Sequence, residues 1–160
     1  MATRDADPVF VDTNVLVYAH VAEAPWHREA QDALGVHEAA GTALWVSRQV
    51  LREYLVSLTR PQQFPIPPEL ETVVAQVRQF QQRFRVANEG PEVTTRLLAL
   101  LLEVPTRGRR IHDANIVAPM LVYGVRRLLT NNPDDFVPFA ALIDVLPLVT
   151  PPPPVAPPNA

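Results

Sequence analysis

The sequence predicts an α/β fold, a three-layer α/β/α sandwich whose central sheet is mostly parallel and has four to five strands. Short β-prone runs alternate with longer segments whose apolar residues recur at helical spacing, which is typical of strand–helix–strand units. Helices cover both faces of a parallel sheet of this kind. The length of 160 residues suits one domain, and the 48% hydrophobic content is enough to fill one core.

The first half of the chain opens with a strand, a polar turn and a helix. The β-prone run Pro8–Asp12 leads into the polar residues Asp12-Thr13-Asn14, and the apolar run Val15–Ala19 indicates the start of a helix. Further along, Ser47 belongs to the residue types that accept hydrogen bonds at a helix N-terminus. The other elements expected here are a helix at Trp26–Ala40, a strand at Ala43–Val46 and a helix that Ser47 caps and that runs through Leu58.

The second half of the chain begins after a loop at Pro61–Pro68, which contains four prolines. Apolar residues at helical spacing predict two helices, Glu69–Phe84 and Pro91–Glu103. A third helix, which contains Pro119, is expected to keep its first turn and to end at Gly124 with a left-handed cap. That helix spans His112–Tyr123, and the last strands are expected at Arg127–Thr130 and Leu142–Leu146.

The domain limits follow from composition at the two ends of the chain. Six prolines in Pro151–Pro158 prevent both helix and sheet pairing, so residues 149–160 are expected to form a disordered, proline-rich tail. Residues 1–8 are expected to be a leader, and residues 9–148 the folded domain. The charged N-terminus does not resemble a signal peptide, and no apolar run reaches the length of a membrane span. We therefore expect a soluble cytoplasmic protein with no membrane partner.

Two residue types are missing from the sequence, and several chemistries are excluded with them. The absence of cysteine excludes disulfides, thiolate zinc sites and a cysteine nucleophile. The absence of lysine excludes a P-loop, a Schiff base and phosphatases that require a lysine. The net charge is -3, so contact with nucleic acid requires a local basic patch.

Acidic residues follow strands of the predicted sheet, at the edge where parallel sheets bind ligands. Asp12 and the Asp134/Asp135 pair follow strands, and ligands bind outside the carboxyl ends of strands in such sheets. Each acid, taken singly, could instead have an ordinary structural role. Asp12 and Asp113 could cap helices, and Glu53 could be a solvated side chain, so these roles and a shared site both remain open. Clustered carboxylates repel one another, so a shared site would require a cation, and Mg²⁺ prefers such oxygen ligands.

Four sequence elements stand in a fixed order along the chain: Val11-Asp-Thr-Asn-Val-Leu16, Leu51-Arg-Glu-Tyr-Leu55, His112-Asp-Ala-Asn-Ile-Val-Ala118 and Leu129-Thr-Asn-Asn-Pro-Asp-Asp-Phe136. Together they resemble the PIN-domain nucleases, and within them the VapC-type toxins of bacterial toxin–antitoxin pairs. The resemblance spans roughly Val9 to Pro147. It implies Mg²⁺-dependent hydrolysis of RNA, with Mn²⁺ as the other candidate ion, by an endonuclease that leaves 5′-phosphate and 3′-hydroxyl ends. It also implies a cognate antitoxin and a homodimer.

Carried over by position, the resemblance implies that Asp12, Glu53 and Asp113 are catalytic acids that bind the metal. Relatives often have a fourth acid where this chain has Asn132, so Asp135 becomes the nearest catalytic carboxylate, ahead of Asp134. The polar residues expected to orient these acids by hydrogen bonds are Thr13, Asn14, Thr130 and Asn132.

A tight basic group precedes Asp113 and is the candidate for holding the phosphates of a tRNA, rRNA or mRNA substrate. A solvated surface run is the competing interpretation. The group consists of Arg107, Arg109 and Arg110. The alternative function is a catalytically weak or inactive PIN-like module that binds RNA or protein, because the neutral Asn132 leaves a second metal site in doubt.

Overall fold

The computed structural model describes residues 7–61, 64 and 66–150 and contains a five-stranded sheet in which every pairing is parallel. The strand order is β3-β2-β1-β4-β5. The expectation of a mostly parallel sheet of four to five strands is therefore confirmed. The strands are β1 (Val9–Val11), β2 (Leu44–Ser47), β3 (Arg85–Ala87), β4 (Arg127–Thr130) and β5 (Asp144–Pro147).

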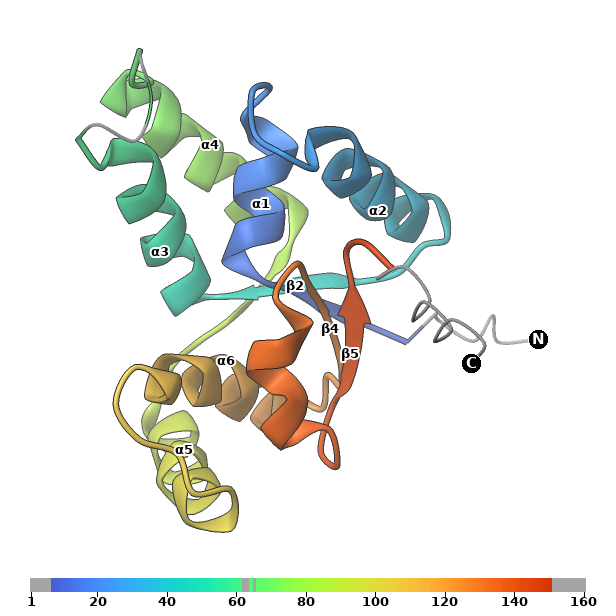
Figure 1. Ribbon diagram of the computed structural model, residues 1–160, viewed down its shortest axis with the longest axis vertical. Helices are drawn as coiled ribbons and strands as arrows, with labels where there is room; N and C mark the ends of the chain where they lie inside the picture. Colours follow the sequence, from blue (N-terminus) through green and yellow to red (C-terminus); the bar gives the residue numbers. More distant parts are fainter. Residues whose placement is uncertain (1–6, 62–63, 65, 151–160) are drawn as a thin grey trace, which may run out of the picture.

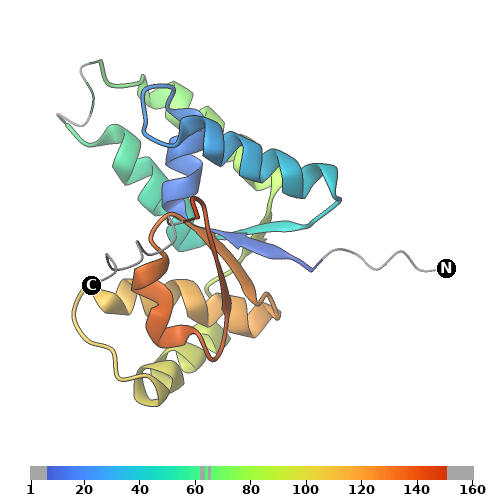
Figure 2. The same cartoon turned by 45° about the vertical axis from the view of Figure 1, so that its right-hand side comes forward.

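Helices cover both faces of the sheet, which gives the three expected layers (Figures 1 and 2). One layer holds α1 (Thr13–His20), α2 (His27–Ala39), α3 (Arg48–Thr59) and α4 (Leu70–Arg83). The other layer holds α5 (Pro91–Glu103), α6 (Arg110–Tyr123) and the 3₁₀ helix η1 (Pro133–Phe139). Among the helices of the described ranges, none combines the length and apolar character that crossing a bilayer requires.

The core lies against the central strands. Val9, Phe10 and Val11 are all completely buried, because β1 has a strand on each side and helices above and below. Leu128 and Leu129 of β4 are buried beside them, in register with Phe10 and Val11. This apolar frame holds the ends of β1 and β4 rigidly next to each other.

Local signals located most helix ends correctly. Ser47 accepts a hydrogen bond from the Val50 N–H (3.2 Å) at the start of α3. Gly124 ends α6 in the left-handed conformation at φ 71°, as expected from its lack of a Cβ. The helix α6 continues through Pro119, and its first turn, which carries Asp113, is intact. The prediction of a proline-rich disordered tail, like most of the predicted leader, lies outside the described residues.

Two strands differ from the sequence-based expectation. The strand β3 was not expected, because its three residues follow α4 almost directly and are recognisable only by their pairing with β2. The strand β5 begins at Asp144, whereas a strand had been expected from Leu142. The N–H groups of Leu142 and Ile143 donate to the Phe139 carbonyl (2.8 and 3.1 Å), so these two residues belong to the turn that follows η1.

The sheet changes its direction of growth between β1 and β4. From β1 the chain builds outward through β2 and β3, and it then crosses to the other side of β1 to add β4 and β5. Loops that leave adjacent strands in opposite directions open a crevice at the carboxyl ends of those strands. Asp12 follows β1 directly, and Thr130 ends β4, so both lie at this crevice.

Candidate active site

Asp12 occupies the carboxyl end of β1 and is held by one hydrogen bond from its backbone N–H and three to its carboxylate. Its backbone N–H donates to the Leu129 carbonyl of β4 (3.0 Å). Its Oδ1 accepts from the Thr13 N–H (2.7 Å), which makes Asp12 the N-cap of α1. Its Oδ2 accepts from Thr130 Oγ1 (2.8 Å) and from Asn14 Nδ2 (3.3 Å). The sequence allows Asp12 either to cap a helix or to belong to a shared acidic site. In the structure its side chain caps α1 and also lies at the crevice, so the two roles are compatible.

The loop after β4 is tied to the same corner. Asn14 Oδ1 accepts from the Asn131 N–H (3.1 Å), and Thr130 Oγ1 accepts from the Asn132 N–H (3.0 Å). The predicted orienting residues Asn14 and Thr130 thus hold both Asp12 and the backbone of the next loop. Asn132 contributes to this network through its backbone and lines the crevice.

Glu53 reaches the crevice from α3. Its Oε2 accepts from Thr13 Oγ1 (2.8 Å), and its Oε1 accepts from Gln49 Nε2 (2.7 Å). The side chain is half-buried between these donors. Glu53 is therefore a fixed member of the site, and the interpretation of a freely solvated glutamate is wrong.

The acids converge on one open cavity of about 790 Å³, which we call the acidic groove. Asp113, in the first turn of α6, and Asp135, in the first turn of η1, come from the layer opposite Glu53. Asp134, the less favoured candidate for the fourth acid, does not line the groove. The lining residues used below are Asp12, Thr13, Asn14, Tyr18, Gln49, Arg52, Glu53, Arg60, Asp113, Asn115, Asn132 and Asp135.

The electrostatics of the acidic groove favour bound positive charge. Burial raises the pKa of Asp12 from 3.8 to about 6; hydrogen bonds from Thr130 and Thr13 oppose this rise, and the charges of Glu53 and Asp113 add to it. Burial also raises the pKa of Asp113, and the neighbouring charges of Asp135 and Glu53 act in the same direction. Burial and the neighbouring charges thus make ionisation of Asp12 and Asp113 more costly.

The donor set fits a hard divalent cation that keeps part of its water. Every acid that lines the groove is an oxygen ligand, and Mg²⁺ is typically bound by one or two carboxylates together with water. Within the described part of the chain, no three histidine or acidic side chains are close enough together to hold one ion by themselves. The groove is therefore an open site rather than a closed cage.

Several groove residues were not anticipated from the sequence. Gln49 and Asn115 line it, although only the acids near them were singled out. The spacing of Gln49 and Glu53, one helical turn apart, is the signal that could have indicated a shared face. Arg52 and Arg60 also line the groove, whereas the basic group Arg107, Arg109 and Arg110 is exposed around the start of α6, outside the groove lining.

A second cavity, of about 540 Å³, lies between the end of α1, α3 and α4. Its described walls include the apolar side chains of Leu58, Phe64 and Val73, and its carboxylates come from separate segments, Glu23 from the loop after α1 and Glu69 from the residue before α4. It has no converging set of acids comparable to the acidic groove. We therefore assign the candidate chemistry to the groove.

A family comparison identifies the chain as a whole. The family model described as PIN domain matches residues 9–141. The chain belongs to the PIN domain family. The PIN domain here thus covers both layers of helices and all strands except β5, and it includes every acid of the groove.

Solved structures of similar fold include a complex described as toxin–antitoxin. VapBC2 from Rickettsia felis, bound to a DNA fragment from its promoter, shares 18% identity at a TM-score of 0.63, covering 87% of this chain and 97% of that chain. A toxin–antitoxin complex from Klebsiella pneumoniae shares 23% identity at a TM-score of 0.61, covering 88% of this PIN domain chain and 98% of the other.

A third structure adds a described RNA target. VapC20 from Mycobacterium tuberculosis, described as a sarcin-ricin loop cleaving toxin, shares 20% identity at a TM-score of 0.57, covering 75% of this chain and 86% of that one. At these identities the likeness concerns the PIN fold. None of the curated proteins matches the chain in sequence.

Proposed function

We propose that this PIN domain is an Mg²⁺- or Mn²⁺-dependent endoribonuclease and the toxin of a toxin–antitoxin pair. The observation that carries the proposal is the meeting of Asp12, Glu53, Asp113 and Asp135 in one groove at the carboxyl ends of the strands. The fold similarity to VapC-type toxins supports the RNA substrate and the toxin role.

The reaction is hydrolysis of a phosphodiester. The oxygen of water forms a bond to phosphorus, the bond from phosphorus to O3′ breaks, and O3′ takes up a proton, which leaves 5′-phosphate and 3′-hydroxyl ends. A bound divalent cation lowers the pKa of water and stabilises negative charge on the phosphate. Asp12, Glu53 and Asp113 line the groove and would hold the ion in part directly and in part through its bound water, and Asp135 would complete the acidic wall. Thr13 and Thr130 keep two of these carboxylates oriented.

Two arginines, one in α3 and one at its C-terminal end, offer contacts for RNA phosphates in the groove. Arg52 lies within α3, Arg60 is the residue directly after its last turn, and both line the groove. Arg52 NH2 also pairs with Glu89 Oε2 (2.8 Å). We assign Arg60 to the phosphate backbone first, because within the described ranges it makes no ion pair. Contact of RNA with Arg107, Arg109 and Arg110 stays a prediction.

The proposed regulator is a small antitoxin protein that covers the acidic groove. A basic side chain inserted among the four carboxylates would offset the burial and the mutual repulsion that raise the pKa of Asp12 and Asp113. The similar structures from Rickettsia felis and Klebsiella pneumoniae are toxin–antitoxin complexes, which supports such a partner. The expected homodimer and the cytoplasmic location stay predictions.

Metal-dependent cleavage of RNA tests the proposal. Purified protein is incubated with tRNA and with ribosomal RNA, in Mg²⁺ or Mn²⁺ and in EDTA, and the product ends are mapped. We expect cleavage only with the divalent ion, and its loss in Asp12→Asn. The matched control is Asp134→Asn, which removes a carboxylate outside the groove. Cleavage that persists in Asp12→Asn or in EDTA would refute the proposal.

The alternative function, a non-catalytic binding module, gives a different outcome in the same experiment. It was suggested by Asn132, which replaces an acid found in relatives. The groove nevertheless contains a fourth carboxylate, that of Asp135, beside Asn132. Binding of RNA without cleavage under every metal condition would favour the module.

A further inference from the structure

Gln49 is a buried polar side chain in the wall of the acidic groove. It is 6% exposed and lies in the first turn of α3, one helical turn before Glu53, so that the two side chains share a face of the helix. Among the roles described above, none accounts for it. A buried amide is costly unless its donors and acceptor are paired, so its partners indicate what it does.

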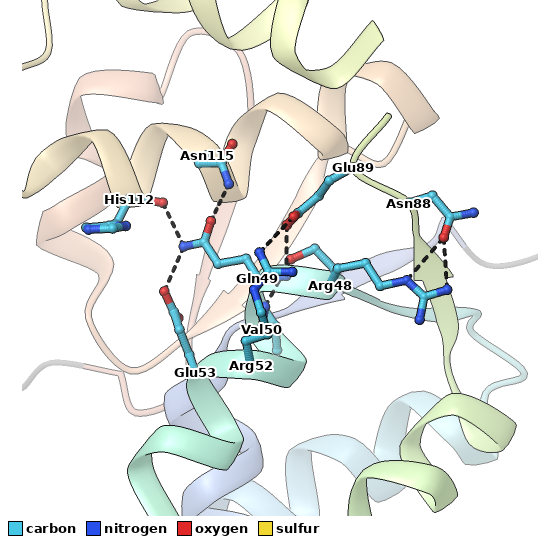
Figure 3. Close-up of polar contacts among 10 residues, drawn as sticks. Arg48, Gln49, Val50, Arg52, Glu53, Asn88, Glu89, His112 and Asn115 are labelled. Atoms are coloured by element: carbon cyan, nitrogen blue, oxygen red, sulfur yellow. Dashed lines mark hydrogen bonds and ion pairs between the residues drawn. The ribbon is translucent and has the colours of Figure 1, made fainter. Parts of the chain in front are cut away.

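The amide of Gln49 connects two helices. Nε2 donates to Glu53 Oε1 (2.7 Å) and to the His112 carbonyl (3.2 Å), and Oε1 accepts from Asn115 Nδ2 (Figure 3). This pattern admits one orientation of the amide. A flipped amide would turn its oxygen toward a carboxylate and a carbonyl, and its nitrogen toward another NH₂ group.

The backbone of Gln49 is anchored as well. Its N–H donates to Glu89 Oε1 (2.8 Å), and the other oxygen of Glu89 accepts from Arg52 (2.8 Å; Figure 3). The helix α3 packs mainly on α1 and α4, whereas α6 packs mainly on α5 and η1, so α3 and α6 share little direct packing. The hydrogen bonds of Gln49 bridge these two helices, which carry Glu53 and Asp113.

We propose that Gln49 is a positioning residue that fixes the Glu53 carboxylate and holds the first turn of α6, so that Glu53 and Asp113 can serve one divalent cation. This inference rests on the proposed function. Gln49 holds one oxygen of Glu53 as Thr13 holds the other, which aims the free lone pairs of the carboxylate into the groove. Loss of such outer hydrogen bonds typically weakens metal binding about 10- to 100-fold.

The test is the affinity of the purified, RNA-free protein for Mn²⁺, measured by calorimetry and by electron paramagnetic resonance. Gln49→Met keeps the length of the side chain and removes all three hydrogen bonds. We expect its Mn²⁺ affinity to fall about tenfold or more. The matched control is Gln31→Met, because Gln31 also donates from Nε2 to a backbone carbonyl, that of Ala19 (3.2 Å), away from the groove. The control should bind Mn²⁺ like the wild type.

A double variant separates positioning from a general loss of structure. If Gln49 acts through Glu53, the combined loss of Mn²⁺ affinity in Gln49→Met/Glu53→Gln is smaller than the product of the two single losses. Losses that simply multiply would overturn the inference. In cleavage assays, kcat should fall in Gln49→Met while KM for RNA stays near the wild-type value; a rise in KM alone would also overturn it.

Asn115→Ala keeps the inference testable if Gln49→Met fails to fold. That variant removes one hydrogen bond of the Gln49 amide, and we expect Mn²⁺ affinity to fall about threefold, as for the loss of one neutral hydrogen bond. A folded Asn115→Ala or Gln49→Met variant with wild-type Mn²⁺ affinity overturns the positioning role alone. Wild-type protein that binds no Mn²⁺ overturns the proposed function, and this inference with it.

Discussion

Replacing Asp12 by asparagine removes a buried negative charge and keeps the size of the side chain. In the native protein this carboxylate is almost fully buried, and burial with the neighbouring acids raises its pKa from 3.8 to about 6. The folded state therefore binds a proton more tightly than the unfolded state does. The stabilisation from this difference is complete below pH 3.8 and is lost as the pH rises through about 6.

The size of the effect follows from the pKa shift. A rise from 3.8 to about 6 corresponds to about 3 kcal/mol of unfolding free energy, lost by the wild type on going from acid to neutral pH. In Asp12→Asn the cap on Thr13 N–H survives, because asparagine also accepts there. The bonds from Thr130 and Asn14 to Oδ2 are lost, at about 1 kcal/mol each. Without metal, Asp12→Asn should thus be about 1 kcal/mol more stable at pH 7.5 and less stable than wild type at pH 4.5.

Urea unfolding in EDTA across pH 4.5 to 7.5 measures this difference. The other titrating groups are present in both proteins, so their contributions to the pH dependence of unfolding nearly cancel in the difference between wild type and variant. Addition of Mg²⁺ at pH 7.5 should then stabilise the wild type and leave Asp12→Asn nearly unchanged, since binding to the folded state alone adds stability. Two parallel stability curves, with a difference that does not vary with pH, would refute the account of Asp12.

The other predictions concern single contacts in and around the acidic groove. Asp135→Asn should slow RNA cleavage about tenfold or more, whereas Asp134→Asn, outside the groove, should stay near the wild-type rate in the same assay. Thr130→Val leaves buried polar partners without a hydroxyl, so urea unfolding should show a loss of about 2 kcal/mol. Arg60→Ala should lower the salt dependence of RNA binding by about 0.7 in log–log slope, and Arg78→Ala, on the exposed side of α4, should leave it unchanged in a fluorescence anisotropy titration.

Local chemistry made much of the fold predictable from the sequence. Ser47 and Gly124 mark helix ends through interactions with residues a few positions away, and such interactions form in the same way in any fold. The strand β3 could not be predicted in this way. Its identity depends on pairing with β2, which lies far away in the chain.

The candidate site, like the fold, was predictable from the sequence only in part. Asp12, which follows a strand, and Asp113, near the start of a helix, indicated an acidic site at the ligand-binding edge of a parallel sheet, and the resemblance to PIN-domain nucleases added Glu53. Their sequence also allowed Glu53 to be an ordinary solvated side chain. Only its hydrogen bonds to Thr13 and Gln49, across the packed helices, assign it to the groove.

By itself, the sequence determined the fold class, the helix caps, the absence of cysteine and lysine chemistry, and the acids available for a metal site. The tertiary structure decided that Asp135 rather than Asp134 faces the groove, and that Gln49 and Asn115 join the helices that carry the acids. The physical reason is the distance along the chain over which each kind of interaction acts. Backbone preferences and caps act over a few residues, whereas the distance between side chains on α3 and α6 is set by packing and hydrogen bonds between segments that meet only in the folded chain.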